Sequence, residues 1–271
     1  MSDGGELTFF VWADTHFGYK PRFGDDDLRH RAVRQMRELR GYPYPAQVGG
    51  CVGEPAFILH CGDYVDGGGG EEEVALYLYC MRRIALPSYE TLGNHELPNA
   101  AAVSYFVEKY RGRYYSFEAG GVRFISLYKP HGIYEEVPPM DAEQLQWLAG
   151  QLAEAGPDKP LVIFCHARPE NMPNAADLDS VLSKGKVILM FVGHTHLQWS
   201  EGGINPYDWN GRPCVIVGHV RDHPIDPIYG RTFAVVRITR DQVAVVPWRW
   251  DLAAWSRAPG DNEAECFVTD Y

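Results

Sequence analysis

The chain has 271 residues, of which 45% are hydrophobic, and its formal net charge is −11. That hydrophobic content supports a full core and excludes a mainly disordered chain. An acidic surface repels nucleic-acid polymers, which bind through basic patches. Nucleic acid is therefore not the expected partner, whereas a small phosphorylated substrate is compatible with this charge.

The sequence lacks the features of a secreted or membrane-spanning protein. Residues 1–6 have no basic or apolar signal region, and no apolar run reaches the roughly 18 residues that a membrane helix needs. The six cysteines show no paired spacing, and several adjoin apolar runs, where reduced thiols behave as small hydrophobes. We therefore expect a cytoplasmic protein with no membrane contact.

Apolar runs and helical periods alternate along the first part of the chain. Asp25, Asp26 and Asp27 can cap a charged helix, and proline and glycine mark the loops between elements. In chain order, the patterns predict a strand at 7–12, a helix at 25–40, a loop at 41–55, a strand at 56–61, a helix at 71–84, a strand at 88–92 and a helix at 99–110.

The second part is richer in strands, beginning with a hairpin around Gly120 and Gly121. Strand–helix alternation followed by strands indicates two packed sheets with helices outside, in a single domain covering residues 1–271. The tail at 251–271 has no clear period. The patterns predict strands at 114–117 and 122–127, a helix at 141–153, strands at 161–165 and 187–192, and antiparallel strands at 215–217, 232–238 and 243–248.

Polar motifs follow five of the predicted strands. Taken singly each motif is weak, because a cap or a satisfied polar pair explains it equally well. In order after five strands, they bring carboxylates, imidazoles and one amide to the strand ends, where such folds bind ligands, and indicate a site for two divalent metals. The motifs are Asp14-Thr15-His16, Gly62-Asp63-Tyr64-Val65-Asp66, Gly93-Asn94-His95-Glu96, His166 and Gly193-His194-Thr195-His196.

This set resembles the calcineurin-like metallophosphoesterase superfamily, whose pattern is D-x-H, G-D-x-x-D, G-N-H-[DE], a lone H and G-H-x-H. The match is complete from residue 14 to residue 196. The resemblance implies an α/β fold, a four-layer α/β/β/α sandwich with a mixed central pair of sheets. It also implies that one metal is held by Asp14, His16 and His196, the other by Asn94, His166 and His194, and that both are bridged by Asp63.

A mixed nitrogen and oxygen site of this kind suits Mn, Fe or Zn, as divalent or trivalent ions. Two such metals lower the pKa of a bridging water and generate a hydroxide nucleophile near neutral pH. The resemblance makes His95 the general acid for the leaving group, with Asp66 holding its ring. The alternatives are a structural histidine at 95 and a helix or loop cap at Asp66.

Two departures bear on the subfamily. Serine/threonine phosphoprotein phosphatases have an arginine after the second aspartate and another before G-N-H-E, where this chain has Gly67 and Leu92. Protein phosphatase activity is therefore not expected. Purple acid phosphatases need a tyrosine ligand where Asp66 stands, so that branch is also disfavoured.

Several charged and aromatic residues adjoin the motifs and are candidate substrate contacts. Arginine can bind a phosphate through two hydrogen bonds, although a solvated surface role is an equal alternative for each of these residues. Arg221 lies downstream of the last motif, as do His219 and His223, for which the surface role is favoured. The predicted substrate-binding residues are Tyr19, Lys20, Arg22 and Arg168.

These observations predict a dinuclear-metal hydrolase of phosphate esters that acts on a small-molecule monoester or diester. A nuclease of the same superfamily is disfavoured by the net charge and by the lack of a Lys/Arg cluster. A catalytically silent metal-binding scaffold is disfavoured because all seven predicted ligands and His95 are present. The oligomeric state cannot be predicted from these patterns.

Overall fold

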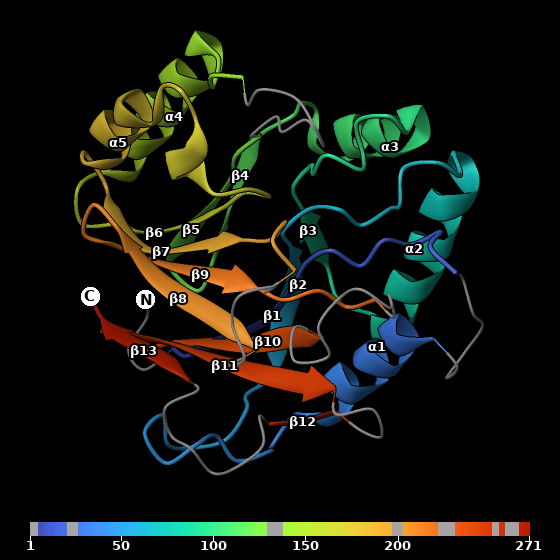
Figure 1. Ribbon diagram of the computed structural model, residues 1–271. Coiled ribbons are helices and arrows are strands. Elements are labelled where there is room, and N and C mark those ends of the chain that lie inside the picture. The colour runs from blue at the N-terminus through green and yellow to red at the C-terminus, as the bar shows by residue number, and fades with distance from the viewer. Residues whose placement is uncertain are drawn as a thin grey trace.

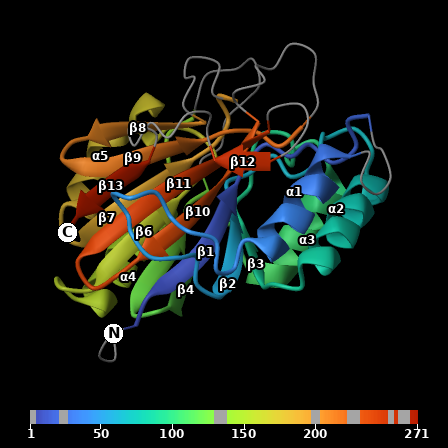
Figure 2. The same ribbon diagram turned by 90° about the horizontal axis from the view of Figure 1, so that it is seen from below.

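Two β-sheets pack face to face, and helices cover the outer face of each sheet (Figure 1). The computed structural model describes residues 5–20, 27–128, 138–196, 203–221, 231–250, 255–257 and 266–271. The layers are visible from below, where α1, α2 and α3 stand on one side of the strands (Figure 2). The predicted four-layer α/β/β/α arrangement is confirmed.

The first sheet carries the N-terminal strands. Strands β1, β2 and β3 are parallel, and β10 lies antiparallel to β1. Helices α1 (Leu28–Glu38), α2 (Glu71–Ile84) and α3 (Ala100–Tyr110) cover its outer face. The strand order is β12 (Trp255–Arg257), β11 (Gln242–Trp250), β10 (Thr232–Ile238), β1 (Leu7–Trp12), β2 (Pro55–His60) and β3 (Ser88–Glu90), with β13 (Phe267–Asp270) beside β11.

The second sheet has a parallel centre and antiparallel edges. Helices α4 (Ala142–Ala155) and α5 (Ala175–Leu182) cover its outer face, and a short 3₁₀ turn, η2 (Pro169–Asn171), precedes α5. The strand order is β4 (Tyr115–Ala119), β5 (Val122–Ser126), β6 (Pro160–Phe164), β7 (Lys186–Val192), β9 (Arg212–Val217) and β8 (Ile204–Trp209).

The alternation of side chains along a strand separates the core into layers. In β1, Phe10 and Trp12 pack against the helices, whereas Phe9 packs between the two sheets. Phe9 stacks on Phe57 of the same sheet at 4.9 Å and meets Phe124 of the other sheet edge-on at 5.4 Å between ring centroids. Interlocking aromatic rings therefore fix the two sheets against each other at their inner faces.

Most of the predicted elements are present, with three kinds of difference. Strand β9 begins earlier than expected; it pairs antiparallel with β8, as expected, and also runs parallel to β7 at the centre of its sheet. Helix α5 and strand β8 were not predicted. The expected tail contains β12 and β13, which pair with β11 in register. No helix in the described ranges is long and apolar enough to cross a membrane.

Candidate metal centre

The seven predicted metal ligands lie where strands of both sheets end. Four of them follow β1, β2 and β3 of the first sheet, and three follow β6 and β7 of the second. The carboxyl ends of these strands therefore meet at one edge of the sandwich. The two predicted donor groups each contain residues from both sheets.

The first predicted group brings Asp14, His16 and His196 together, with their ligand atoms within 4.8 Å of one another. His196 Nε2 lies 3.1 Å from Asp14 Oδ1 and 3.4 Å from His16 Nε2. Asp14 Oδ1 is buried, and within the described residues it accepts no hydrogen bond. A buried carboxylate oxygen facing two imidazole nitrogens fits a divalent cation.

The second group is built around His166, whose Nε2 lies 3.1 Å from Asn94 Oδ1 and 3.1 Å from His194 Nδ1. Asp63 Oδ2 is 3.2 Å from that nitrogen and 3.8 Å from His16 Nε2 of the first group. The Asp63 carboxylate thus lies between the two groups. This position fits the bridging role expected for it.

The backbone that presents these side chains is unusual. The φ angle is positive at Asp14 (51°), His16 (43°), Asp63 (55°), His194 (67°) and His196 (49°). Left-handed backbone at a non-glycine residue costs about 1–3 kcal/mol and gathers at functional sites. Main-chain hydrogen bonds hold part of it in place, because the amides of Asp14 and His16 each donate over 3.0 Å to the segment after β2.

Two motif glycines allow the strand ends to approach one another. A Cβ at Gly93 would lie 2.2 Å from Oδ1 of Asp63, and a Cβ at Gly193 would lie 2.7 Å from Oδ2 of Asp14. Any larger residue at either position would displace a predicted ligand. Glycine is therefore required at these two positions because the neighbouring carboxylates leave no room for a side chain.

Charges in the centre strongly perturb one another. Burial alone would raise the pKa of Asp63, but His166 and His16 beside it hold that pKa well below its usual range. Burial would lower the pKa of His166, yet Asp63 and Asp14 raise it to about 9. Burial lowers the pKa of His16 to about 4. The carboxylates therefore favour positive charge at this centre.

His95 and Asp66 adjoin the donor groups, but not in the arrangement that was predicted. His95 Nδ1 lies 2.7 Å from the main-chain oxygen of Asp66, so the ring donates to a carbonyl rather than to the carboxylate. The Asp66 carboxylate instead lies 3.3 Å from His16 Nδ1. The rings of His95 and His16 meet edge-on at 4.4 Å between centroids, so the two imidazoles are direct neighbours.

The position of the Asp66 carboxylate beside His16 Nδ1 bears on the other nitrogen of that ring. An Nδ1–H that donates to Asp66 leaves the Nε2 lone pair directed at the donor groups. His166 is oriented in the same way, because its Nδ1 lies 2.8 Å from the main-chain oxygen of Cys61. In both rings a proton on Nδ1 would leave Nε2 able to bind a metal.

Arg29 is a residue of the site that the sequence patterns did not reveal. Its guanidinium is buried and donates to the main-chain oxygens of Thr15 (3.2 Å), His16 (2.7 Å) and Tyr19 (3.3 Å). Asp27, the N-cap of α1, accepts from Arg29 Nε over 2.7 Å. Arg29 therefore fastens the loop that carries the first motif to the start of α1.

Glu96, the last residue of its motif, has a similar structural task. Its buried carboxylate accepts from the main-chain amides of Asp63 (2.9 Å), Val65 (3.0 Å) and Gly93 (2.6 Å). Burial and the nearby Asp63 raise the pKa of Glu96 to about 8, against these hydrogen bonds. Glu96 thus ties the second motif to the third.

The predicted substrate contacts are only partly brought to the centre. Tyr19 lies under the guanidinium of Arg221 at 5.8 Å, and Arg221 Nη2 is 3.1 Å from His196 Nδ1. Lys20 is exposed beside the Tyr19 ring. Arg168 is held by Glu170 at 2.6 Å and by a tyrosine ring.

The other three residues considered as substrate contacts are Arg22, His219 and His223. Arg22 and His223 lie outside the described residues. His219 is buried, with its Nδ1 3.2 Å from the main-chain oxygen of His196, so the expected surface role of His219 is wrong. Its imidazole packs behind a predicted ligand rather than facing solvent.

A family model described as calcineurin-like phosphoesterase matches residues 7–198. The chain belongs to the calcineurin-like phosphoesterase family. The matched span contains every predicted metal ligand as well as His95 and Asp66. The family assignment made from the motifs is confirmed.

Curated members of this family share part of the chain. Serine/threonine-protein phosphatases CPPED1 from Homo sapiens and Pongo abelii are each 28% identical over 165 residues, covering 56% of this chain and 52% of theirs. The chain therefore spans about half the length of the curated relatives that it matches.

Solved structures of the same fold extend over the whole chain. A dimetal phosphatase from Danio rerio has a TM-score of 0.67 at 17% identity and covers 98% of this chain and 99% of its own. Purple acid phosphatase PPD1 from yellow lupin (Lupinus luteus) seeds has a TM-score of 0.64 at 14% identity, over 99% of this chain and 54% of its own. These similarities confirm the fold.

Proposed function

We propose that this protein is a metal-dependent hydrolase of phosphate esters. The observation that carries the proposal is the position of Asp63, whose carboxylate lies 3.2 Å from His166 in one donor group and 3.8 Å from His16 in the other. Two adjacent donor groups joined by one carboxylate are the arrangement that a dinuclear site requires. Membership of the calcineurin-like phosphoesterase family supports the same activity.

The described donors fit two metal ions. Asp14, His16 and His196 would hold one, and Asn94, His166 and His194 the other, with Asp63 between them. The donor set combines imidazole nitrogens with carboxylate and amide oxygens and contains no thiolate, which favours Mn, Fe or Zn. When bound, such ions activate water and neutralise charge on a phosphoryl group.

The remaining residues have roles that follow from their contacts. The Nδ1–H of His95 donates to the Asp66 carbonyl, so Nε2 is the ring nitrogen left to exchange a proton with the leaving group. The main-chain amide of His95 donates to Asp63 over 2.9 Å, which fixes the ring beside the donor groups. Asp66 orients His16, and Arg221, beside His196, can hold a phosphoryl oxygen.

Two classes of substrate are compatible with this activity. A small phosphate ester, monoester or diester, needs only the metals and one or two cations, and it agrees with the net charge of −11. A phosphoprotein is the second candidate, because the relatives at 28% identity are named serine/threonine-protein phosphatases. None of the six cysteines, all of which lie in the described ranges, forms a disulfide, which supports action in a reducing compartment such as the cytoplasm.

Metal removal and one substitution test the activity together. Chelation should abolish hydrolysis of p-nitrophenyl phosphate, and added Mn²⁺ should restore it. His95→Asn should retain about two metals per chain by mass spectrometry while turnover falls by roughly 10²–10⁴, the contribution of a positioned acid. Full activity in metal-stripped protein would refute the proposal, and loss of metal from the variant would make His95 a ligand.

The substrate class needs a separate competition assay. Single- and double-stranded DNA are offered at moderate salt together with the chromogenic ester. Weak inhibition is expected, because the chain lacks the continuous basic track that releases counterions from a polymer. Strong inhibition by DNA, or its cleavage, would favour a nuclease instead.

A further inference from the structure

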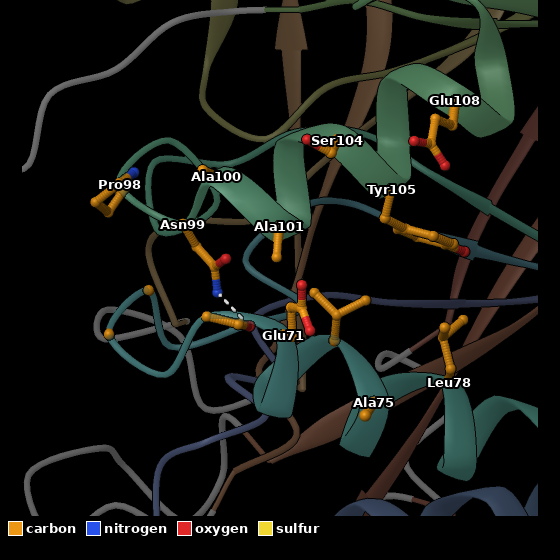
Figure 3. A pocket seen from close by; sticks show the side chains of 14 residues that line it. Glu71, Ala75, Leu78, Pro98, Asn99, Ala100, Ala101, Ser104, Tyr105 and Glu108 are labelled. Carbon is orange, nitrogen blue, oxygen red and sulfur yellow. Dashed lines mark hydrogen bonds between the residues drawn. The ribbon is translucent and has the colours of Figure 1, made fainter.

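A groove of about 840 Å³ lies between helices α2 and α3, outside the metal centre. Figure 3 shows the side chains of the two helices facing each other across it. Val74 and Leu78 of α2 and Ala101 of α3 give it an apolar floor. Small residues on both helices, including Ala75 and Ser104, leave room between them.

One end of the groove adjoins the catalytic residues. Its lining begins at Gly67, which directly follows Asp66, and a Cβ at Gly67 would lie 2.7 Å from the main-chain oxygen of His95. Asn99, the N-cap of α3, donates over 3.1 Å to the main-chain oxygen of Gly70, the residue before α2. The Gly67 end of the groove therefore lies beside His95, and the starts of the two helices are joined to each other.

The rim of the groove is acidic. Glu71 and Glu108 line it, both exposed, and neither forms an ion pair with any residue in the described ranges. Glu73 is different, because its carboxylate accepts from the amides of Gly67 (3.0 Å) and Gly68 (3.3 Å) and supports the loop. Two uncompensated carboxylates thus flank an apolar floor.

We propose that this groove docks a basic peptide segment of a phosphoprotein substrate and directs its phosphorylated residue toward the metal centre. Arginine or lysine side chains of the peptide pair with Glu71 and Glu108, and its apolar side chains lie on Val74 and Leu78. The inference rests on the proposed phosphoesterase function and selects the second of its substrate classes. This chain has Gly67 and Leu92 where serine/threonine phosphoprotein phosphatases have arginines. Docking outside the metal centre would supply affinity in place of those arginines.

Charge decides between the occupants that such a groove could take. A nucleic acid or an anionic membrane would bring phosphates against Glu71 and Glu108 and be repelled. A second copy of this chain carries the same net charge of −11 and would be repelled overall. A basic, partly apolar peptide is the complementary partner.

Binding of a peptide without phosphate to the metal-loaded protein tests the proposal without relying on catalysis. The probe is a short fluorescein-labelled peptide of alternating arginine and leucine, followed by fluorescence anisotropy, with alternating glutamate and leucine as its counterpart. Glu71→Lys combined with Glu108→Lys should weaken binding of the basic peptide by about tenfold at low salt, since exposed pairs contribute modestly and are screened. Ala75→Trp, which fills the groove at unchanged charge, should weaken binding as well.

A matched control separates the groove from the net charge. Glu38→Lys on α1 combined with Glu154→Lys on α4 makes the same charge change at exposed positions on other helices, and binding should stay near the wild-type value. Equal loss in this control, or equal binding of the acidic peptide, would overturn the proposal. So would a dimer in sedimentation that Ala75→Trp dissociates without any effect on the peptide.

Hydrolysis of p-nitrophenyl phosphate is measured in parallel with the metal-loaded protein. The groove variants should hydrolyse this small ester at the wild-type rate, because none of the changed residues belongs to the metal centre. Peptide binding without any hydrolysis would reject the phosphoesterase function and leave the docking groove intact. Hydrolysis without peptide binding would reject the groove alone.

Discussion

Arg29 offers the most direct test of how the fold holds the first motif in place. Arg29→Ala removes three hydrogen bonds to the loop oxygens of Thr15, His16 and Tyr19 and leaves the buried Asp27 without its cation. Breaking a buried pair by removing one partner costs about 3–5 kcal/mol. That is a large part of the roughly 5–15 kcal/mol by which domains are stable, so the free energy of unfolding in urea should fall by about this amount.

Arg29→Lys separates charge from geometry. One ammonium retains the charge opposite Asp27 but cannot reach three carbonyls at once, so stability should fall by less than in Arg29→Ala. Relaxation of the loop would release the left-handed backbone at Asp14 and His16, and Mn²⁺ affinity in titration calorimetry should fall by about 10–100-fold, as for other residues that orient ligands.

The control is Arg37→Ala, a substitution of an exposed arginine on the same helix, which should change stability by no more than about 0.5 kcal/mol. Mn²⁺ affinity of Arg29→Lys equal to that of the wild type would refute the positioning role. Equal stability losses in Arg37→Ala and Arg29→Ala would refute the energetic argument.

Three further predictions follow from the contacts described above. Burial would raise the pKa of Glu90, but Lys109 and tyrosine hydroxyls lower it below 4.5. The ionised Glu90–Lys109 pair therefore stabilises the fold above pH 4.5. This stabilisation is lost as the pH falls through the lower pKa that Glu90 has in the folded state. Acid titration of Glu90→Gln, followed by circular dichroism, should therefore be shallower than that of the wild type below pH 4.5, and identical curves would contradict this. Asp66→Ala should reduce metal content at the His16 group and lower turnover by about 10–100-fold, whereas unchanged metal content by mass spectrometry would place its effect elsewhere. Glu96→Gln should destabilise by about 1–3 kcal/mol in urea, because an NH₂ donor meets main-chain amides that also donate, and an unchanged midpoint would argue against this network.

Local patterns were sufficient to predict which polar side chains lie at the strand ends. Each motif directly follows an apolar strand, and the ends of parallel strands meet at one edge of a sheet. That rule predicts that Asp14 and Asp63 lie together, whereas the approach of His166 depends on how the second sheet packs against the first. The motif glycines were equally informative, since Gly93 and Gly193 stand where a side chain would collide with a carboxylate.

Other contacts depend on how distant segments pack, which no local pattern reveals. In the sequence, Arg29 is one of several charged residues of a predicted helix. In the structure, α1 packs so that the Arg29 guanidinium is buried against the loop that carries the first motif. The carboxylate of Asp66 lies beside His16, whereas His95 contacts the main-chain oxygen of Asp66. Strand β13 lacks a strong period, and its position comes from pairing with β11.

The mixed origin of the two donor groups has a mechanical consequence. Asp14 and His16 extend from one sheet and His196 from the other, 180 residues along the chain from His16. A cation held by all three would act as a cross-link between the two halves of the sandwich. Because such a cross-link closes a long loop only in the folded chain, much of the free energy of metal binding would be free energy of folding. Metal supply would then govern the lifetime of the folded molecule as well as its chemistry.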